Sequence, residues 1–129
     1  MLGYIWVSIG SAVGGAARFW ISGLIAARYG PTFPFGTLAV NVTGSFIVGL
    51  FAALTVPEGR WLMSPSMREL LMIGFCGGYT TFSSFSLQTF ALLQGGEWWR
   101  ATANAIASFT LCFVAVWLGY FAISAINKS

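Results

Sequence analysis

Four long apolar windows occupy most of this sequence of 129 residues. A helix needs about 20 residues to cross the hydrocarbon core of a membrane, and each window supplies that length. We expect the membrane-spanning helices at about Tyr4–Ala27, Phe35–Val56, Met67–Leu93 and Thr102–Ile126. Only 7% of the residues are charged, against about 25% in an average soluble domain, so the chain lacks the polar residues that would cover a water-soluble bundle. The sequence therefore predicts an all-α membrane protein, with residues 1–129 forming a single four-span domain.

The third window contains a segment that does not suit an uninterrupted helix in lipid. After the glycine pair Gly77-Gly78, five of the seven residues from Thr80 to Ser86 carry a hydroxyl group. Backbone N–H and C=O groups that leave a helix at membrane depth are tolerated only where protein or a polar cavity satisfies them. We therefore expect the third helix to be broken near residues 76–81. Broken helices are where channels and transporters hold ions.

The acidic residues are absent from the interior of the predicted spans. Glu58, Glu69 and Glu97 lie at or beyond the span ends, and the chain has no histidine. A small coupled exporter of cations or drugs needs an acid inside the membrane, so this class is disfavoured. A zinc site is excluded as well, because it needs four nitrogen or sulfur ligands and only Cys76 and Cys112 are present. The six cations are scattered along the chain, which argues against nucleic-acid binding.

A few polar residues do lie inside the predicted spans. Arg18 carries a charge deep in the first span. It either donates its N–H groups to carbonyls freed by the break or raises the local positive potential in favour of an anion. Asn41 needs a partner in a membrane core, so we expect it to face a pore or a ligand. Polar residues also recur at helical spacing on the second and fourth spans: Thr37, Asn41 and Ser45, then Asn104, Ser108 and Cys112.

Phe82 and Phe85 are three residues apart after the break and share a face if this part is helical. Phenylalanine usually serves packing, and with twelve in the chain that interpretation stays open. The ring edges carry partial positive charge, however, and together with amide and hydroxyl donors they can coordinate a small anion. A neutral lining of this kind would release the ion again, as conduction requires.

The charges that flank the spans give no clear orientation. Arg60, Arg68 and Lys128 fall on the side of the two termini, and Arg28 and Arg100 fall on the other side. With so small a bias, either the chain inserts in both orientations and pairs antiparallel with itself, or a single topology is set by other features.

Two further features concern packing. The glycines at small-xxx-small spacing, Gly10/Gly14 and Gly74/Gly78, are explained equally well by contact between subunits and by packing within one subunit. Trp20 and Trp117 lie away from the span ends, where an aromatic belt belongs, so we expect both to pack inside.

Three stretches carry a resemblance to a known family. They are residues 14–19 (GGAARF), 36–46 (GTLAVNVTGSF) and 74–86 (GFCGGYTTFSSFS), and with the length and span count the resemblance covers essentially the whole chain. On these residues the sequence resembles the Fluc fluoride channels, the CrcB family. The resemblance implies an antiparallel, dual-topology homodimer with two fluoride pores. It implies a channel in the inner membrane of a bacterium and not an enzyme.

The resemblance also implies roles for individual residues. A structural Na⁺ would lie at the two-fold axis, held by the backbone carbonyls of Gly77 and Thr80 from both subunits. Phe82 and Phe85 would form aromatic boxes around fluoride, and Asn41 would be a donor in the pore.

Further polar contacts are implied along the same path. Hydroxyl contacts and an extended polar track would come from Ser83, Ser84, Ser108, Thr37 and Asn104. Two positions depart from the family pattern: Ser84 stands where threonine is common, and Cys112 stands where a hydroxyl is expected.

A passive channel suffices for fluoride export. Neutral HF enters the cell and dissociates in the cytoplasm, and an inside-negative potential drives the anion outward by about 2.3 kcal/mol per charge per 100 mV. The alternatives are the small coupled exporter of cations or drugs and a structural membrane subunit without transport of its own.

Overall fold

The computed structural model describes residues 1–57 and 59–127, and their regular structure is all helical. Four segments are long and apolar enough to cross a membrane: α1 (Leu2–Tyr29), α2 (Phe35–Ala53), Pro65–Gln94 and α6 (Trp98–Asn127). The protein is therefore a multi-pass membrane protein. Glu58 and Lys128, which the sequence places beyond the spans, lie outside the described residues.

The third membrane-spanning segment consists of four consecutive pieces. The short helix α3 (Pro65–Arg68) begins after Ser64, whose Oγ accepts the N–H of Met67 at 3.3 Å. The segment continues as a π-helix, η1 (Glu69–Cys76), and as α4 (Gly77–Tyr79). It resumes as α5 (Phe82–Gln94), so the helical backbone is interrupted between Tyr79 and Phe82.

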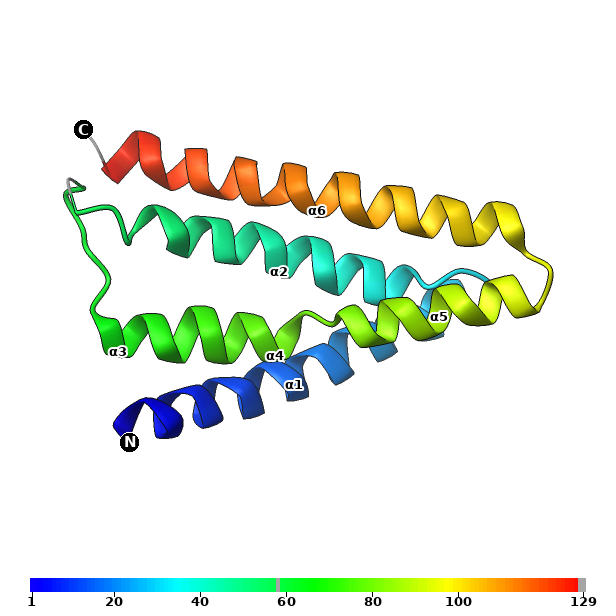
Figure 1. Cartoon of the computed structure of the whole chain (residues 1–129), viewed down its shortest axis with the longest axis horizontal. Helices are drawn as coiled ribbons and strands as arrows, with labels where there is room; N and C mark the ends of the chain where they lie inside the picture. The colour runs from blue at the N-terminus through cyan, green and yellow to red at the C-terminus, as the bar shows by residue number, and fades with distance from the viewer. Residues whose placement is uncertain (58, 128–129) are drawn as a thin grey trace.

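The helices run side by side along one long axis (Figure 1). The N-terminus, the end of α6 and the connection from α2 to α3 lie at one end of the molecule, and the other two connections lie at the opposite end. The most extensive helix contacts join α2 to α6 and α1 to η1. The interruption between α4 and α5 lies near the middle of the bundle, between α1 and α2 (Figure 1).

Glycines bring α1 into backbone contact with the third segment. A Cβ atom on Gly10 would overlap the carbonyl oxygen of Leu70, and one on Gly14 would overlap that of Phe75. From the other side, a Cβ on Gly78 would lie 2.7 Å from the carbonyl oxygen of Ser11. The small-xxx-small glycines therefore pack within the subunit, which decides between the two explanations that the sequence left open.

The pair α2–α6 is built in the same way. A Cβ on Gly49 would overlap the carbonyl oxygen of Val116, and one on Gly119 would overlap that of Phe46. With no Cβ between them, the two helix backbones approach closely and gain dispersion contacts, which drive helix association where lipid removes the hydrophobic effect.

The outer surface of the single chain is rich in large apolar side chains. Trp20 is 65% exposed and Trp117 is 58% exposed, so the expectation that both pack inside the subunit is wrong. A side chain facing lipid or a second protein chain meets apolar surroundings just as a buried one does, and the sequence does not separate these cases.

The close approach of α1 makes Gly14 a sensitive position. We expect Gly14→Ala to destabilise the protein by about 1–3 kcal/mol, because the added methyl group must displace the backbone of Phe75 and Tyr79. Gly23→Ala is the matched control on the same helix, since a Cβ there meets nothing within 4 Å. The control should be neutral or stabilising by up to about 1 kcal/mol. Thermal unfolding in detergent measures both, and equal midpoints for the two variants would contradict the assigned contact.

Candidate functional site

Thr80 and Thr81 form the interruption of the third segment. Both have extended backbones, with φ −81° and ψ 155° at Thr80 and φ −150° and ψ 112° at Thr81. Thr80 stays tied to the preceding turn, because its N–H and its Oγ1 both donate to the carbonyl of Cys76, at 3.0 and 2.9 Å. Thr81 begins the next helix, because its Oγ1 accepts the N–H of Ser84 at 3.1 Å.

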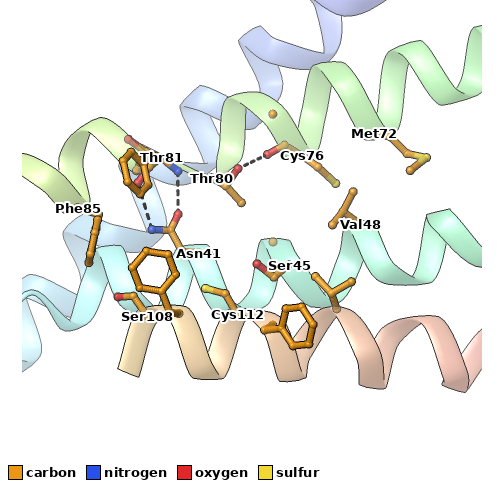
Figure 2. Close-up of a pocket in the computed structure, with 16 residues that line it drawn as sticks. Asn41, Ser45, Val48, Met72, Cys76, Thr80, Thr81, Phe85, Ser108 and Cys112 are labelled. Atoms are coloured by element: carbon orange, nitrogen blue, oxygen red, sulfur yellow. Dashed lines mark hydrogen bonds between the residues drawn. The ribbon is translucent and has the colours of Figure 1, made fainter. Parts of the chain in front are cut away.

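Asn41 on α2 supplies hydrogen-bond partners for the backbone of Thr81. Its Oδ1 accepts the N–H of Thr81 at 2.7 Å, and its Nδ2 donates to the carbonyl of Thr81 at 3.1 Å (Figure 2). In a continuous α-helix the N–H of Thr81 would instead bond to the carbonyl of Gly77. The Asn41 amide thus holds the interrupted backbone in place. Because the N–H of Thr81 bonds to Asn41, the carbonyl of Gly77 is left without its helical donor.

Arg18 reaches the same region from α1. Its Nε donates to the carbonyl of Gly78 at 3.2 Å. In a continuous helix that carbonyl would accept the N–H of Phe82, which the interruption moves away. The contact is the one expected for a structural role of Arg18, and it also brings the positive charge of the guanidinium next to the interruption.

The end of α4 therefore presents carbonyl groups that have lost their helical donors. Such a C-terminal helix end carries partial negative charge and favours a cation. Gly77 is exposed on the single chain, and a Cβ built there would meet nothing within 4 Å. The fold of the single chain thus gives no steric reason for glycine at this position. The backbone of Gly77 is open to approach from outside the chain.

An open cavity of about 540 Å³ lies beside the interruption (Figure 2). Its walls come from α2, from the third segment on both sides of Thr80, and from α6. The polar lining residues are Asn41, Ser45, Thr80, Thr81 and Ser108, and Cys76 and Cys112 each add a thiol. The aromatic lining residues are Phe82, Phe85, Phe109 and Phe113. No carboxylate or histidine belongs to the lining that the described residues provide.

The aromatic side of the cavity is a connected set of rings. The ring centroids of Phe82 and Phe85 are 5.4 Å apart at an angle of 42°. Phe85 in turn meets Phe109 at 6.2 Å with a nearly perpendicular angle of 83°, an edge-to-face contact. Phe85 is only 9% exposed, whereas Phe82 is 70% exposed. The ring of Phe85 is thus a buried part of the cavity wall, whereas most of the Phe82 side chain is exposed on the surface of the single chain.

A buried polar chain continues from the cavity along α6. Ser108 Oγ donates to Asn104 Oδ1 at 3.4 Å, and Asn104 Nδ2 donates to Thr89 Oγ1 at 2.9 Å. Thr89 then donates to the carbonyl of Phe85 at 2.7 Å. Thr89 is not among the site residues predicted from the sequence, although its position four residues after Phe85 places it on the same helix face.

The structure brings together some of the predicted site residues and separates others. Those that line the cavity are Asn41, Gly77, Thr80, Phe82, Phe85 and Ser108. Those that lie outside its lining are Arg18, Thr37, Ser83, Ser84 and Asn104. Among the latter, Ser83 is exposed and its Oγ lies 3.3 Å from Thr81 Oγ1, while the N–H of Ser84 is used by that same hydroxyl.

Thr37 lines a second cavity, of about 600 Å³, between the end of α1, the start of α2 and α5. Gln88 belongs to the same lining, and its buried Oε1 has no hydrogen-bond partner among the described residues. Gln88 is not among the site residues predicted from the sequence, because a glutamine near a span end that belongs to no polar repeat gives no signal of a site.

Comparison with known proteins decides the family. Residues 5–120 match the family described as "CrcB-like protein, Camphor Resistance (CrcB)". This chain belongs to the CrcB family. Similar proteins named "Fluoride-specific ion channel FluC" occur in Opitutus terrae, with 55% identity over 97% of this chain and 95% of the relative, and in Methylocella silvestris, with 53% identity over the same shares. A third, from Paramagnetospirillum magneticum, is 51% identical over 99% of this chain and all of the relative.

The double contact between Asn41 and Thr81 predicts a measurable loss of stability. We expect Asn41→Leu to cost about 1–3 kcal/mol for each backbone group of Thr81 that is left unpaired. Ser45→Ala is the matched control, because Ser45 lies one turn further along α2 and lines the same cavity. Thermal unfolding in detergent should show a large loss for Asn41→Leu and a small one for Ser45→Ala. A stability loss no larger than that of the control would show that Asn41 does not hold the interruption.

Proposed function

We propose that this CrcB-family chain is a fluoride-selective channel that exports F⁻ passively from the cytoplasm across the inner membrane of a bacterium. The observation that carries the proposal is the cavity beside the interrupted third segment, where an amide, hydroxyls and aromatic rings meet without a carboxylate or histidine in the described lining. The names of the relatives support fluoride as the transported ion. A channel needs neither catalytic groups nor a coupled proton, so the protein is not an enzyme.

The neutral lining favours conduction over tight binding. Ring edges of Phe82 and Phe85 and the donors of Asn41 and Ser108 offer partial positive charge to a small anion. A full positive charge in the wall would hold the ion too strongly, whereas partial charges at several places allow it to enter and leave. Ser83 and Ser84, at the start of α5, and Thr37 and Asn104, beyond the cavity, would extend the polar path outside the cavity lining.

We further propose that two copies of the chain pair antiparallel and that each pore is completed at their contact. Phe82 is 70% exposed on one chain and belongs to the lining of an open cavity, so a second chain would cover this ring and complete the wall. The sequence assigns Arg28 and Arg100 to one side of the membrane and Arg60, Arg68 and Lys128 to the other, and a bias of a single charge permits insertion in both orientations.

The antiparallel arrangement predicts that a tag on the C-terminus will be found on both sides of the membrane in comparable amounts. Labelling of the tag with a reagent that cannot cross membranes, before and after permeabilisation of intact cells, measures the two fractions. A tag found on one side alone would contradict the antiparallel pair.

A structural Na⁺ is proposed at the contact of the two interruptions. The carbonyls of Gly77 and Thr80 would hold it from both subunits, since carbonyl oxygens at a helix C-terminus suit a hard cation and need no acidic side chain. The open backbone at Gly77 leaves room for that approach. A bound cation would offset the cost of unpaired carbonyls in apolar surroundings. Fluoride flux that is undiminished after purification and reconstitution without Na⁺ would contradict a required role.

Fluoride efflux from liposomes that contain only this protein tests the proposed function. We expect rapid release of F⁻ down its gradient when a K⁺ ionophore balances the charge, and no comparable release of Cl⁻. Release no faster than from empty liposomes would overturn the channel, and equal release of both anions would overturn the selectivity.

The same assay tests the aromatic lining. Phe82→Ile and Phe85→Ile keep bulk and apolarity but remove the positive ring edge, so we expect at least one of them to lower fluoride flux by about tenfold, equivalent to about 1.4 kcal/mol. Phe90→Ile is the control, because Phe90 is exposed on the same helix and lies outside both cavities. If both lining variants conduct as well as the control, the two rings only pack.

A further inference from the structure

Tyr79 is the last residue of α4 and is only 4% exposed. Its ring stacks on that of Phe75, with centroids 5.6 Å apart and an angle of 10°. Its hydroxyl oxygen lies 2.9 Å from Oγ1 of Thr43 on α2. A part-buried hydrogen bond between two side chains thus joins the last turn before the interruption to the neighbouring helix.

The direction of this hydrogen bond follows from the other contacts of Thr43. The Thr43 hydroxyl donates to the carbonyl of Ala39 at 2.8 Å, one turn back on its own helix, and also contacts the carbonyl of Val40 at 3.2 Å. Each hydroxyl carries a single hydrogen, and both hydrogens are paired only when Thr43 donates to Ala39 and its Oγ1 accepts from Tyr79. Tyr79 therefore donates, and Thr43 is the partner that satisfies its O–H.

Three neighbouring residues of α2 contact three consecutive residues at the interruption. Asn41 pairs with the backbone of Thr81, and Thr43 accepts from Tyr79. Gly44, the residue after Thr43, lies so close that a Cβ there would overlap Cγ2 of Thr80 and lie 2.9 Å from the ring of Tyr79. The side chain of Tyr79 is thus one of the points at which α2 fixes the rotation of α4 about its own axis.

We propose that Tyr79 is a positioning residue for ion conduction. By donating to Thr43, its hydroxyl sets the rotation of α4 about the helix axis. This rotation determines where the carbonyls of Gly77 and Thr80 point. It also determines whether the backbone of Thr81 can form its two hydrogen bonds with Asn41. The inference rests on the proposed channel function, because the interruption that Tyr79 orients lines the proposed pore. Tyr79 itself does not belong to the lining of the cavity.

The asymmetry of the bond gives the two single variants different effects. Tyr79→Phe removes the donor and leaves the Thr43 hydroxyl bonded to Ala39. Thr43→Val removes the acceptor and leaves the O–H of Tyr79 without its partner at membrane depth, which costs more than losing the bond. The double variant removes both polar groups, so it should recover toward the level of Tyr79→Phe.

The experiment is the fluoride current through single channels in planar bilayers. A purely structural residue would change how many channels are folded but not the current through each one. We expect Tyr79→Phe to lower the unitary fluoride current by about twofold and Thr43→Val by clearly more, with the double variant recovering to the Tyr79→Phe value. Thr43→Ser, which keeps the hydroxyl, should conduct like the wild type. Ser124→Ala is the control, because Ser124 is buried near the far end of α6.

Unitary currents equal to the wild type in Tyr79→Phe and Thr43→Val would overturn the positioning role, even if fewer channels were found. If Thr43→Val does not assemble, Tyr79→Phe decides alone: a lowered unitary current supports the role and an unchanged one overturns it. An absence of fluoride current in the wild-type protein would instead contradict the proposed function, so the two failures are distinguishable.

Discussion

Every feature of the proposed site depends on one requirement: a backbone group that leaves a helix inside a membrane must find another partner. The two extended residues, Thr80 and Thr81, create that requirement, and side chains from both neighbouring helices meet it. Asn41 from α2 pairs with both backbone groups of Thr81, and Arg18 from α1 donates to the carbonyl of Gly78. The interruption is therefore held from two sides, by α1 and by α2, and it is stable only when these helices lie at fixed distances from the third segment.

Those distances are set by glycine. Helices in lipid gain little from burying apolar side chains, so their association depends on close backbone contact and dispersion. Gly14 on α1 lets the backbone of Phe75 and Tyr79 approach, and Gly44 on α2 makes room for the side chains of Thr80 and Tyr79. With the helices this close, a side chain as short as that of Asn41 reaches the backbone of the next segment directly. The close packing at these glycines is therefore what allows the interruption to find its hydrogen-bond partners.

The sequence predicted the features that follow from local chemistry, and it could not supply those that depend on which helix lies next to which. A glycine pair followed by hydroxyl residues indicated an interruption near residues 76–81, and the helical backbone stops after Tyr79. An asparagine in an apolar span had to have a partner, but only the register of α2 against the third segment shows that Thr81 provides it. The π-helical bonding of η1 carries no sequence signal, because it arises where a helix adapts to its neighbours. The exposure of Trp117 was missed because lipid and protein interior are both apolar.

The interruption also explains how one short segment can serve ions of both signs in the proposed channel. The end of α4 presents carbonyl oxygens and therefore partial negative charge, whereas the start of α5 presents N–H groups and partial positive charge. The two ends are separated only by Thr80 and Thr81, whose own polar groups are largely occupied by Cys76, Ser84 and Asn41. A structural cation at the carbonyl end and a conducted anion near the rings at the amide end would then each meet favourable partial charges. Neither needs a charged side chain as a ligand, which agrees with the absence of carboxylates from the described cavity lining.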